Sequence, residues 1–514
     1  MSETALHRSS SKPLLMIIGV VVLGYVAAAV AGWPQQGTEL VAAQLHAGHS
    51  AAGSATLLAH PPYWMIAPFA ALLLAIAVLP LLPSVSTWWD SNLHKLYVAI
   101  GLGGATILYY LLACNHPILG HWPVEHRVPP SVGGPNVALA MTVLENAILY
   151  EFVPFIVLLL SLYTISGGLR IEGDLPAHPL TNSLFLTAGA VLANLIGTTG
   201  AAMLLIRPLL ETNRERRHVR HTIVFFVFIV CNCGGCLLPI GDPPLFLGYL
   251  MGVPFLWTLD LWPAWLFVNG VLVGTYYCWD RFWCYRQEEK RDLARDETRV
   301  HRLRVAGIWP NAPLLVGVVL SIALLDPAKT LPGTDWHPWI LLREVVQLLL
   351  IAASLGLGSA ATRRQNRFNY HAILEVAALF LGIFISMQAP LEILHVRGPA
   401  IGLRSPAHFF WATGSLSAVL DNAPTYVVFF EAARSLGGGP GELVAGVPEP
   451  LLAAISLGAV FMGAMTYIGN GPNFMVKAIA EKSGVAMPSF FGYVVYSLGV
   501  LLPLYAAVSY LFLR

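Results

Sequence analysis

Two acidic residues lie within apolar stretches, beside residues that end helices. Asp242 is followed by Pro243 and Pro244, and Asp421 directly precedes Asn422. An ionised carboxylate repels an organic anion, whereas it suits a small hard cation, which prefers oxygen ligands. A carboxyl group at membrane depth can also hold a proton, so protons and the cation can compete for one site. These residues therefore predict a site for a small cation or a proton.

Neutral oxygen atoms are expected to complete this site. Side-chain amides and hydroxyls can bind the ion together with backbone carbonyls that are freed where a helix is broken. Asp421 is predicted to be the principal carrier of the cation and of protons. Asp242 is either the second acid or the N-cap of the half-helix that follows it, and both roles can hold. The other predicted ligands are Asn194, Thr198, Asn232, Asn422, Thr425, Asn470 and Asn473.

The residues around Asp242 and Asn470 cannot continue a helix. Proline lacks a backbone N–H, and glycine tolerates non-helical conformations. Unpaired backbone groups cannot face lipid, so each break must lie in a polar cavity lined by protein. Two breaks at matching positions, each beside a carboxylate or a carboxamide, favour a binding site over simple proline kinks. The predicted helix-break residues are Gly241, Pro243, Pro244, Gly469, Gly471 and Pro472.

Composition indicates that a membrane surrounds these elements. Of the 514 residues, 56% are hydrophobic and 11% are charged, whereas soluble domains contain about 25% charged residues. Basic residues lie in short loops, which does not indicate nucleic-acid binding, and no spacing typical of an enzyme's nucleophile and base appears. The CxxC pattern at Cys233–Cys236 is typical either of a metal or redox site or of small residues in close packing, and we expect the latter.

Hydrophobicity predicts ten membrane-crossing segments. Two further apolar stretches, 178–208 and 406–432, carry polar residues at their midpoints and are expected to be re-entrant hairpins, the first from the cytoplasm and the second from outside. This topology places most of the 29 Lys and Arg residues on the cytoplasmic side, in agreement with the positive-inside rule. The predicted spans are 65–82, 93–113, 145–166, 222–258, 262–279, 311–326, 339–358, 371–388, 450–482 and 490–512, of which 222–258 and 450–482 are interrupted.

The first residues allow two interpretations. Residues 14–31 are apolar and follow Arg8 and Lys12, which is typical of either a cleaved signal peptide or a first transmembrane helix. The predicted parts of the chain are a signal peptide or first helix over 1–31, an extracytoplasmic segment over 32–64, a first repeat over 65–279, a cytoplasmic linker over 280–306 and a second repeat over 307–514.

An internal repeat relates the two halves of the chain. At one constant offset, AVLAN at 190–194 matches AVLDN at 418–422, and IGDPP at 240–244 matches IGNGP at 468–472. Each half crosses the membrane an odd number of times, so the second repeat is inverted. Inverted repeats with broken helices are typical of secondary transporters. The predicted fold is an all-α polytopic membrane protein with two inverted repeats, each with a re-entrant hairpin and a broken transmembrane helix.

These motifs resemble the ion transporter superfamily, which includes NhaD-type sodium/proton antiporters and citrate-transporter-like (CitMHS-like) families. NCGG at 232–235 followed by PIGDPP at 239–244 is similar to the broken-helix motif of that group, and DNAPT at 421–425 is similar to its second hairpin tip. The resemblance covers roughly residues 65–512. It implies a scaffold and a mobile transport domain that moves as an elevator, usually within a homodimer.

Two departures from the family pattern bear on the substrate. Cys231 and Cys233 stand where the family motif has Ser and Ile, and the first hairpin tip at 194–199 lacks the Ser-Asn-Thr of the carboxylate carriers. We predict a secondary transporter rather than an enzyme, namely a sodium/proton antiporter, with an ion-coupled citrate or dicarboxylate transporter as the alternative. Arsenite export stays open.

The predicted setting of this transporter is the bacterial inner (plasma) membrane, which the chain crosses several times. It is expected to need no cofactor, with sodium and protons as the transported or coupling ions. The expected partners are the lipid bilayer, a small inorganic cation and a second copy of the chain.

Overall fold

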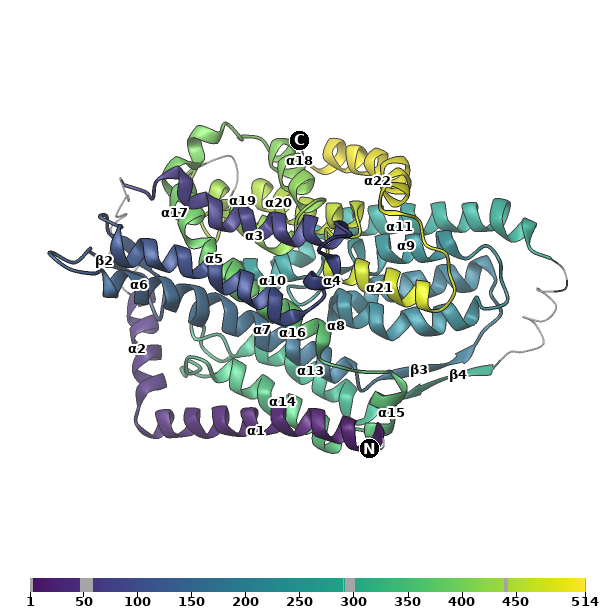
Figure 1. Ribbon diagram of the computed structural model, residues 1–514, viewed down its shortest axis with the longest axis horizontal. Coiled ribbons are helices and arrows are strands. Elements are labelled where there is room, and N and C mark those ends of the chain that lie inside the picture. Colours follow the sequence, from purple (N-terminus) through teal and green to yellow (C-terminus); the bar gives the residue numbers. More distant parts are fainter. Residues whose placement is uncertain (1–2, 47–58, 290, 292–300, 439–441, 514) are drawn as a thin grey trace. The chain divides into compact units, whose positions relative to one another are not determined.

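The computed structural model describes residues 3–46, 59–289, 291, 301–438 and 442–513, so the predicted segments 32–64 and 280–306 lie partly outside the described residues. The chain forms two compact units, and each unit contains segments from both halves of the sequence (Figure 1). Unit 1 consists of residues 1–169 and 307–396. Unit 2 consists of residues 170–306 and 397–514.

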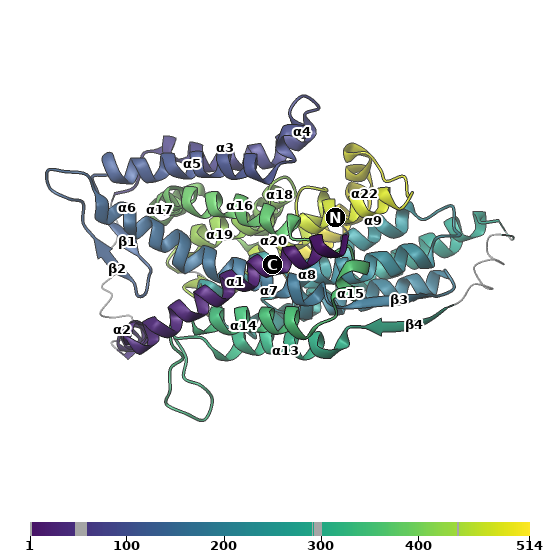
Figure 2. The same cartoon turned by 60° about the horizontal axis from the view of Figure 1, so that its bottom comes forward.

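Unit 1 is built mainly of helices. Figure 2 shows α3 and α5 side by side, and α13 beside α14. Its elements are α1 (Glu3–Val30), α2 (Trp33–His46), η1 (Tyr63–Ile66), α3 (Ala67–Val78), η2 (Leu79–Leu81), α4 (Ser86–Trp89), α5 (Asn92–Leu112), β1 (Ile118–Gly120), β2 (His126–Val128), α6 (Val137–Leu144), the π-helix η3 (Glu145–Phe152), α7 (Val153–Ser166), α13 (Ile308–Leu324), α14 (Leu342–Leu357), α15 (Ala360–Gln365), α16 (His371–Ser386) and α17 (Gln388–Arg397).

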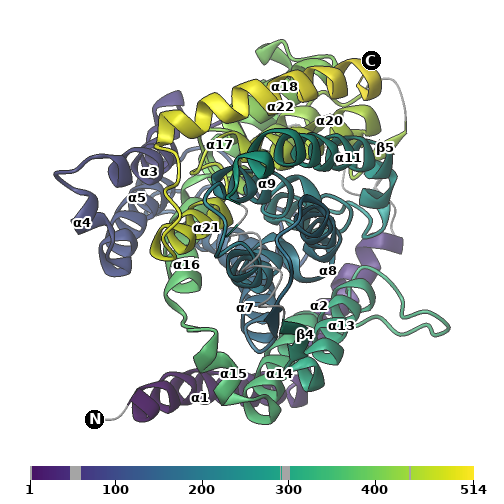
Figure 3. The same cartoon turned by 90° about the vertical axis from the view of Figure 1, so that its right-hand side faces the viewer.

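Unit 2 holds the interrupted helices, and Figure 3 shows α9 and α11 side by side within it. Its elements are β3 (Arg170–Asp174), α8 (Pro179–Thr212), α9 (Arg220–Ile229), η4 (Cys233–Gly235), α10 (Pro243–Leu250), η5 (Trp257–Leu261), α11 (Trp262–Trp279), the π-helix η6 (Asp280–Cys284), η7 (Tyr285–Gln287), β4 (His301–Ala306), η8 (Gly398–Ile401), α18 (Pro406–Ser417), α19 (Asn422–Arg434), β5 (Leu443–Val444), β6 (Val447–Pro448), α20 (Glu449–Met462), η9 (Gly463–Met465), α21 (Gly471–Lys482) and α22 (Phe490–Phe512).

The chain is a mostly helical, multi-pass membrane protein. Among the described residues, five helices are long and apolar enough to cross a membrane, or six if the bent pair α16–α17 counts as one span. Other predicted spans correspond to shorter apolar helices, such as Ile308–Leu324. The five are Lys12–Val30, Asn92–Leu112, Val137–Ser166, Pro179–Thr212 and Phe490–Phe512.

Two features add detail to the predicted helical fold. Three pairs of short antiparallel strands, β1–β2, β3–β4 and β5–β6, form outside the apolar stretches on which the prediction rested. Helix α16 covers the predicted span 371–388 up to Ser386, where the chain bends by 42° into α17. Pro390 lies in the first turn of α17 and has no N–H to donate to the carbonyl of Ser386, which explains the interruption.

The segment α8 folds back on itself as a hairpin. A straight helix of 34 residues would hold its ends about 50 Å apart. The side chains of Asn182 and Asn213 nevertheless hydrogen-bond each other in both directions at 2.8 Å. The reversal lies at Gly197, whose φ of 76° is in the region that favours glycine. The predicted fold-back over 178–208, named hairpin 1, is confirmed, and its entry from the cytoplasm stays a prediction.

Helices α18 and α19 form a second hairpin, named hairpin 2. The rings of Phe409 and Phe429, on opposite arms, lie 6.5 Å apart. The four residues 418–421 connect the arms. This confirms the predicted fold-back over 406–432, whereas the entry of hairpin 2 from outside stays a prediction.

A buried ion-pair cluster joins the base of hairpin 1 to the end of α11. Arg216 donates hydrogen bonds to both carboxylate oxygens of Asp280 and lies 3.5 Å from Glu288. His221 Nε2 lies 3.0 Å from Asp280 Oδ1. Burial alone would raise the pKa of Asp280, but hydrogen bonds from Arg216 and His221 and the charge of Arg216 lower it to about 2. This cluster therefore holds Asp280 ionised.

Candidate functional site

Four backbone reversals or interruptions of unit 2 meet around one carboxylate. They are the tips of hairpins 1 and 2, the interruption between α9 and α10, and the interruption between α20 and α21. The carboxylate belongs to Asp242, which is almost completely buried. We call the residues that hydrogen-bond around it the Asp242 cluster, which consists of Asp242, Thr198, Asn232, Asn422, Asn470 and Asn473.

Three neutral donors hold the carboxylate of Asp242. Thr198 Oγ1 donates to Oδ1 at 2.9 Å, and Asn470 Nδ2 donates to the same oxygen at 3.1 Å. Asn422 Nδ2 donates to Oδ2 at 2.6 Å. Thr198 and Asp242 come from the first half of the chain, and Asn422 and Asn470 come from the second. The cluster therefore forms only when both halves are folded together in unit 2.

A second set of amides supports the first. Asn470 Nδ2 also lies 3.2 Å from Asn232 Oδ1, and Asn232 Nδ2 donates to Asn473 Oδ1 at 2.8 Å. Asn473 Nδ2 in turn donates to the backbone carbonyls of Gly463 and Thr466, both at 2.9 Å. These bonds satisfy carbonyls freed by the helix interruption, as buried backbone groups require. They also fix the orientation of the amides that face Asp242.

Each of the two interruptions contains a close contact between backbone atoms. A Cβ at Gly241 would overlap the carbonyl of Gly235, and a Cβ at Gly469 would lie 2.6 Å from the carbonyl of Gly463. Only glycine allows backbones to approach this closely. The matching glycine pairs occupy corresponding places in the two predicted repeats, which explains why IGDPP and IGNGP both have glycine at the second position.

The electrostatics of the cluster favour a bound cation. In the described part of the chain, the other charged group that acts on the Asp242 carboxylate is Asp421, which is itself an acid. The buried Asn422 Oδ1 has no hydrogen-bond partner among the described residues. A buried carboxylate without a cationic partner is costly, and so is an unpaired amide oxygen. A small cation that binds both oxygens would relieve both costs.

Three helices begin at this cluster. Asp242, Asp421 and Asn470 occupy the N-cap positions of α10, α19 and α21. Free N–H groups and the helix dipole give each N-terminus a partial positive charge. The site thus combines a carboxylate suited to a cation with three helix ends suited to an anion.

The structure separates the roles of the two predicted acids. Asp421 accepts a hydrogen bond from the N–H of Ala423 at 3.1 Å and therefore caps α19. Asp242 makes no capping hydrogen bond to α10 in the described structure, although it occupies the N-cap position. The side chain of Asp242 therefore does not cap α10 through a hydrogen bond in the described structure, and its role as the second acid stays a prediction. The principal role predicted for Asp421 stays a prediction.

A family model described as "Putative citrate transport" matches residues 58–513. The chain belongs to this citrate-transport family. No curated protein matches the chain. Membership of the citrate-transport family establishes a secondary transporter rather than an enzyme. The narrower resemblance to NhaD-type antiporters stays a prediction.

Two predicted ligands of this citrate-transport family member are occupied by other contacts. Asn194 donates to the carbonyls of Ala190 and Gly234 at 2.9 and 2.7 Å, and its oxygen accepts from the N–H of Leu237 at 2.7 Å. Thr425 Oγ1 donates to the backbone carbonyl of Asp421 at 2.9 Å. Both residues position the cluster and are not in hydrogen-bond contact with Asp242.

Thr466, which was not among the predicted site residues, joins the second interruption to hairpin 2. Its hydroxyl donates to the carbonyl of Ala418 at 2.6 Å and accepts from the N–H groups of Ile468 and Gly469 at 3.2 and 3.1 Å. A hydroxyl three residues before the break glycine is the available signal, because Ser and Thr side chains often bond nearby backbone groups.

The cysteines of the first interruption are buried packing residues. Cys231, Cys233 and Cys236 are completely buried free thiols. The described residues contain no group of three metal-ligating side chains. Cys233 Sγ lies 3.5 Å from Tyr505 Oη, and its carbonyl accepts from Asn269 at 3.0 Å.

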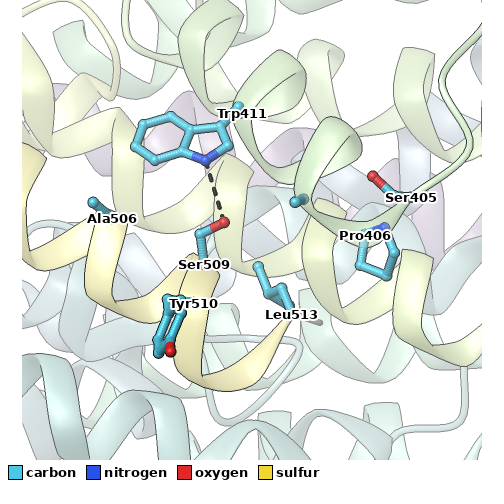
Figure 4. Close-up of a pocket in the computed structure, with 8 residues that line it drawn as sticks. Ser405, Pro406, Trp411, Ala506, Ser509, Tyr510 and Leu513 are labelled. Carbon is cyan, nitrogen blue, oxygen red and sulfur yellow. Dashed lines mark hydrogen bonds between the residues drawn. The ribbon is translucent and has the colours of Figure 1, made fainter.

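A pocket between α18 and α22 shares no residue with the Asp242 cluster (Figure 4). Trp411 Nε1 donates to Ser509 Oγ at 3.2 Å within it. Its lining is mostly apolar and contains no acid, which makes it unsuited to a cation. The lining residues are Ser405, Pro406, Ala407, Trp411, Ala506, Ser509, Tyr510 and Leu513.

Proposed function

We propose that this protein is an ion-coupled secondary transporter of citrate or a related organic anion, and that the Asp242 cluster is its substrate and coupling-ion site. The family match supports the anion as substrate. The observation that carries the proposal is the convergence of three helix N-termini on one buried carboxylate. Helix N-termini favour carboxylate groups, as in other transporters with broken helices.

The coupling follows from the charge of Asp242. Without a cation, the carboxylate would repel an anionic substrate that approached the helix ends. A sodium ion or proton at Asp242 and Asn422 would remove this repulsion and allow the anion to bind. Binding of the cation would therefore precede or accompany binding of the anion, which is the requirement for coupled transport.

A sodium/proton antiporter is the second candidate. The acidic pair Asp242 and Asp421 favours it, because the cluster has no basic side chain hydrogen-bonded to Asp242 within the described residues. In that case Asp242 would hold sodium and protons in turn. Asp421 would modulate this exchange through its nearby charge while it caps α19.

The architecture that we propose for either activity is an inverted repeat in the bacterial inner membrane. The matching glycine pairs and the two hairpins, one from each half of the chain, support the repeat. Unit 2 would be the mobile transport domain, since it contains the cluster, and unit 1 would be the scaffold. The proposed assembly is a homodimer.

Transport in proteoliposomes separates the two candidates. Uptake of labelled citrate that requires a sodium or proton gradient, and is lost in Asp242→Asn, would support the main proposal. Proton movement driven by sodium, lithium or potassium without citrate would support the antiporter instead. Asp260→Asn is the matched control, because Asp260 is an exposed acid on η5 of the same unit. Unchanged citrate uptake in Asp242→Asn would overturn the assigned site.

A further inference from the structure

Unit 1 contains a buried acid that the Asp242 cluster does not use. Glu392 lies on α17, beyond the bend that follows α16. Its Oε2 atom is buried and makes no hydrogen bond within the described residues. No motif in the sequence singles out this residue, since it is an isolated acid in a stretch of mixed polar and apolar residues.

The surroundings of Glu392 are largely apolar. Its helix neighbour Ala389 belongs to a hydrophobic core cluster with Tyr110 and other side chains. Tyr110 is completely buried, and its hydroxyl also lacks a hydrogen-bond partner in the described structure. The Tyr110 hydroxyl lies against the Glu392 carboxyl, although the present geometry does not form a hydrogen bond. The other members of the core cluster are Met65, Tyr109, Cys114, Ile118, Leu139 and Val143.

The titratable groups around Glu392 offer it no paired cation in the described structure. Glu392 interacts electrostatically with Tyr109 and Tyr110 on α5 and with Cys114, which lies two residues after the end of α5. His116 lies beyond Cys114, with its Nε2 3.6 Å from Cys114 Sγ. Its own helix also carries His395 and Arg397, and Glu392 forms no ion pair with either among the described contacts.

Two other acids of unit 1 have cationic partners. Glu375 lies 2.5 Å from Lys95 Nζ, and Glu344 lies 2.6 Å from Arg343. Glu392 differs from both because an ionised carboxylate at its position would be a buried charge without a partner, which is costly. A protonated carboxyl avoids this cost, and its O–H can donate to the free Tyr110 hydroxyl.

A second acid, Glu151, is connected to α17 through Gln388. Gln388 and Glu392 are four residues apart and therefore share one face of α17. Gln388 Nε2 donates to Glu151 Oε2 at 3.1 Å. Glu151 belongs to the π-helix η3, a geometry that often occurs at functional sites. The Gln388–Glu151 contact therefore lies at the bend, on the same face of α17 as Glu392.

We propose that Glu392 is a second proton-binding site, located in unit 1 and independent of the Asp242 cluster. The bound proton forms an O–H bond on the carboxyl group, and a small side-chain rotation would let this O–H donate to the neighbouring Tyr110 hydroxyl. Release of this proton would place a charge among apolar side chains, so α17 would have to shift at the bend to hydrate it. This site goes beyond the proposed function, because it assigns a proton to a different unit.

Infrared difference spectroscopy of the full-length protein in lipid tests this site directly. At neutral pH, the protonated carboxyl should give a carbonyl stretching band that shifts in D2O. Glu392→Gln should remove one carboxyl's contribution to this band. Glu375→Gln is the matched control and should leave the band unchanged, because Glu375 is paired with Lys95.

A second variant tests the same site without removing the Glu392 carboxyl, in case Glu392→Gln does not fold. Tyr110→Phe keeps Glu392 but removes its hydroxyl neighbour, and it should shift the frequency of the same band. A band that is unchanged in both Glu392→Gln and Tyr110→Phe would overturn the proposal, as would its loss in Glu375→Gln. The readout requires no transport, so its failure would be distinct from a failure to transport citrate.

Discussion

Asp242→Asn should abolish stabilisation by the coupling cation while it changes the stability of the cation-free protein little. The carboxylate accepts three hydrogen bonds, from Thr198, Asn422 and Asn470. An amide at position 242 keeps the shape of the side chain. Asn422 can turn its own amide so that Oδ1, which has no partner among the described residues, accepts from the new N–H group.

The magnitude follows from the change in bond type. Hydrogen bonds to a charged group contribute about 1.5–3 kcal/mol and neutral ones about 0.5–1.5 kcal/mol, so the loss is about 1 kcal/mol for each bond. The variant also no longer buries an unpaired charge, a relief of several kcal/mol that offsets this loss. A cation at 100 times its dissociation constant should stabilise the wild-type protein by about 2.7 kcal/mol and the variant by about zero.

Thermal unfolding in detergent measures this difference. Sodium or lithium chloride is titrated against choline chloride at constant ionic strength, and the rise in Tm is compared between proteins. Asp260→Asn should keep the wild-type response, since Asp260 is exposed. A rise in Tm of wild-type size in Asp242→Asn would refute the assignment of the cation to this carboxylate.

Four further predictions concern the elements of unit 2. Gly241→Ala should lower Tm and abolish transport because its methyl group would overlap a backbone carbonyl, whereas Gly471→Ala, with open space around it, should be tolerated. Arg216→Ala should lower the free energy of unfolding by about 3–5 kcal/mol, because it removes the guanidinium that binds both carboxylate oxygens of the buried Asp280, whereas Arg214→Ala at an exposed pair should cost less than about 1 kcal/mol in denaturant unfolding. In wild-type protein, the stability contributed by Asp280 is present above about pH 4, the ordinary range of its pKa, and should be lost in acid titrations as pH falls toward about 2. Single cysteines near residues 210 and 435 should react with membrane-impermeant reagents from opposite faces, and reaction from the same face would contradict the inverted repeat.

The helix interruptions and hairpins could be predicted from local sequence. Proline and glycine at residues 241–244 and 469–472 cannot continue a helix, whatever surrounds them. The reversal at Gly197 likewise requires a positive φ that glycine adopts readily. The repeated motifs then indicated which residues come together, and Asp242, Asn422 and Asn470 do meet in the structure.

The division of roles between the two acids could not be predicted from local sequence. Asp242 and Asp421 both precede a helix, and either residue type can serve as an N-cap. The outcome depends on tertiary neighbours, because the Asp242 carboxylate accepts hydrogen bonds from Thr198 and Asn470, which are distant in sequence. The bend before α17 has a local signal in Pro390, which lies just beyond the predicted span 371–388.

The division of the chain between two units has a consequence for the order of folding during synthesis. Unit 1 needs residues up to 396, and the second segment of unit 2 begins only at 397. Asp242 must therefore enter the membrane long before the ribosome has made Asn422 and Asn470. Until then its carboxylate and the broken backbone beside it lack the amides that later satisfy them. Chains that stop near residue 400 should fold unit 1 and leave an open half of unit 2, which makes that intermediate a natural target for membrane chaperones and proteases.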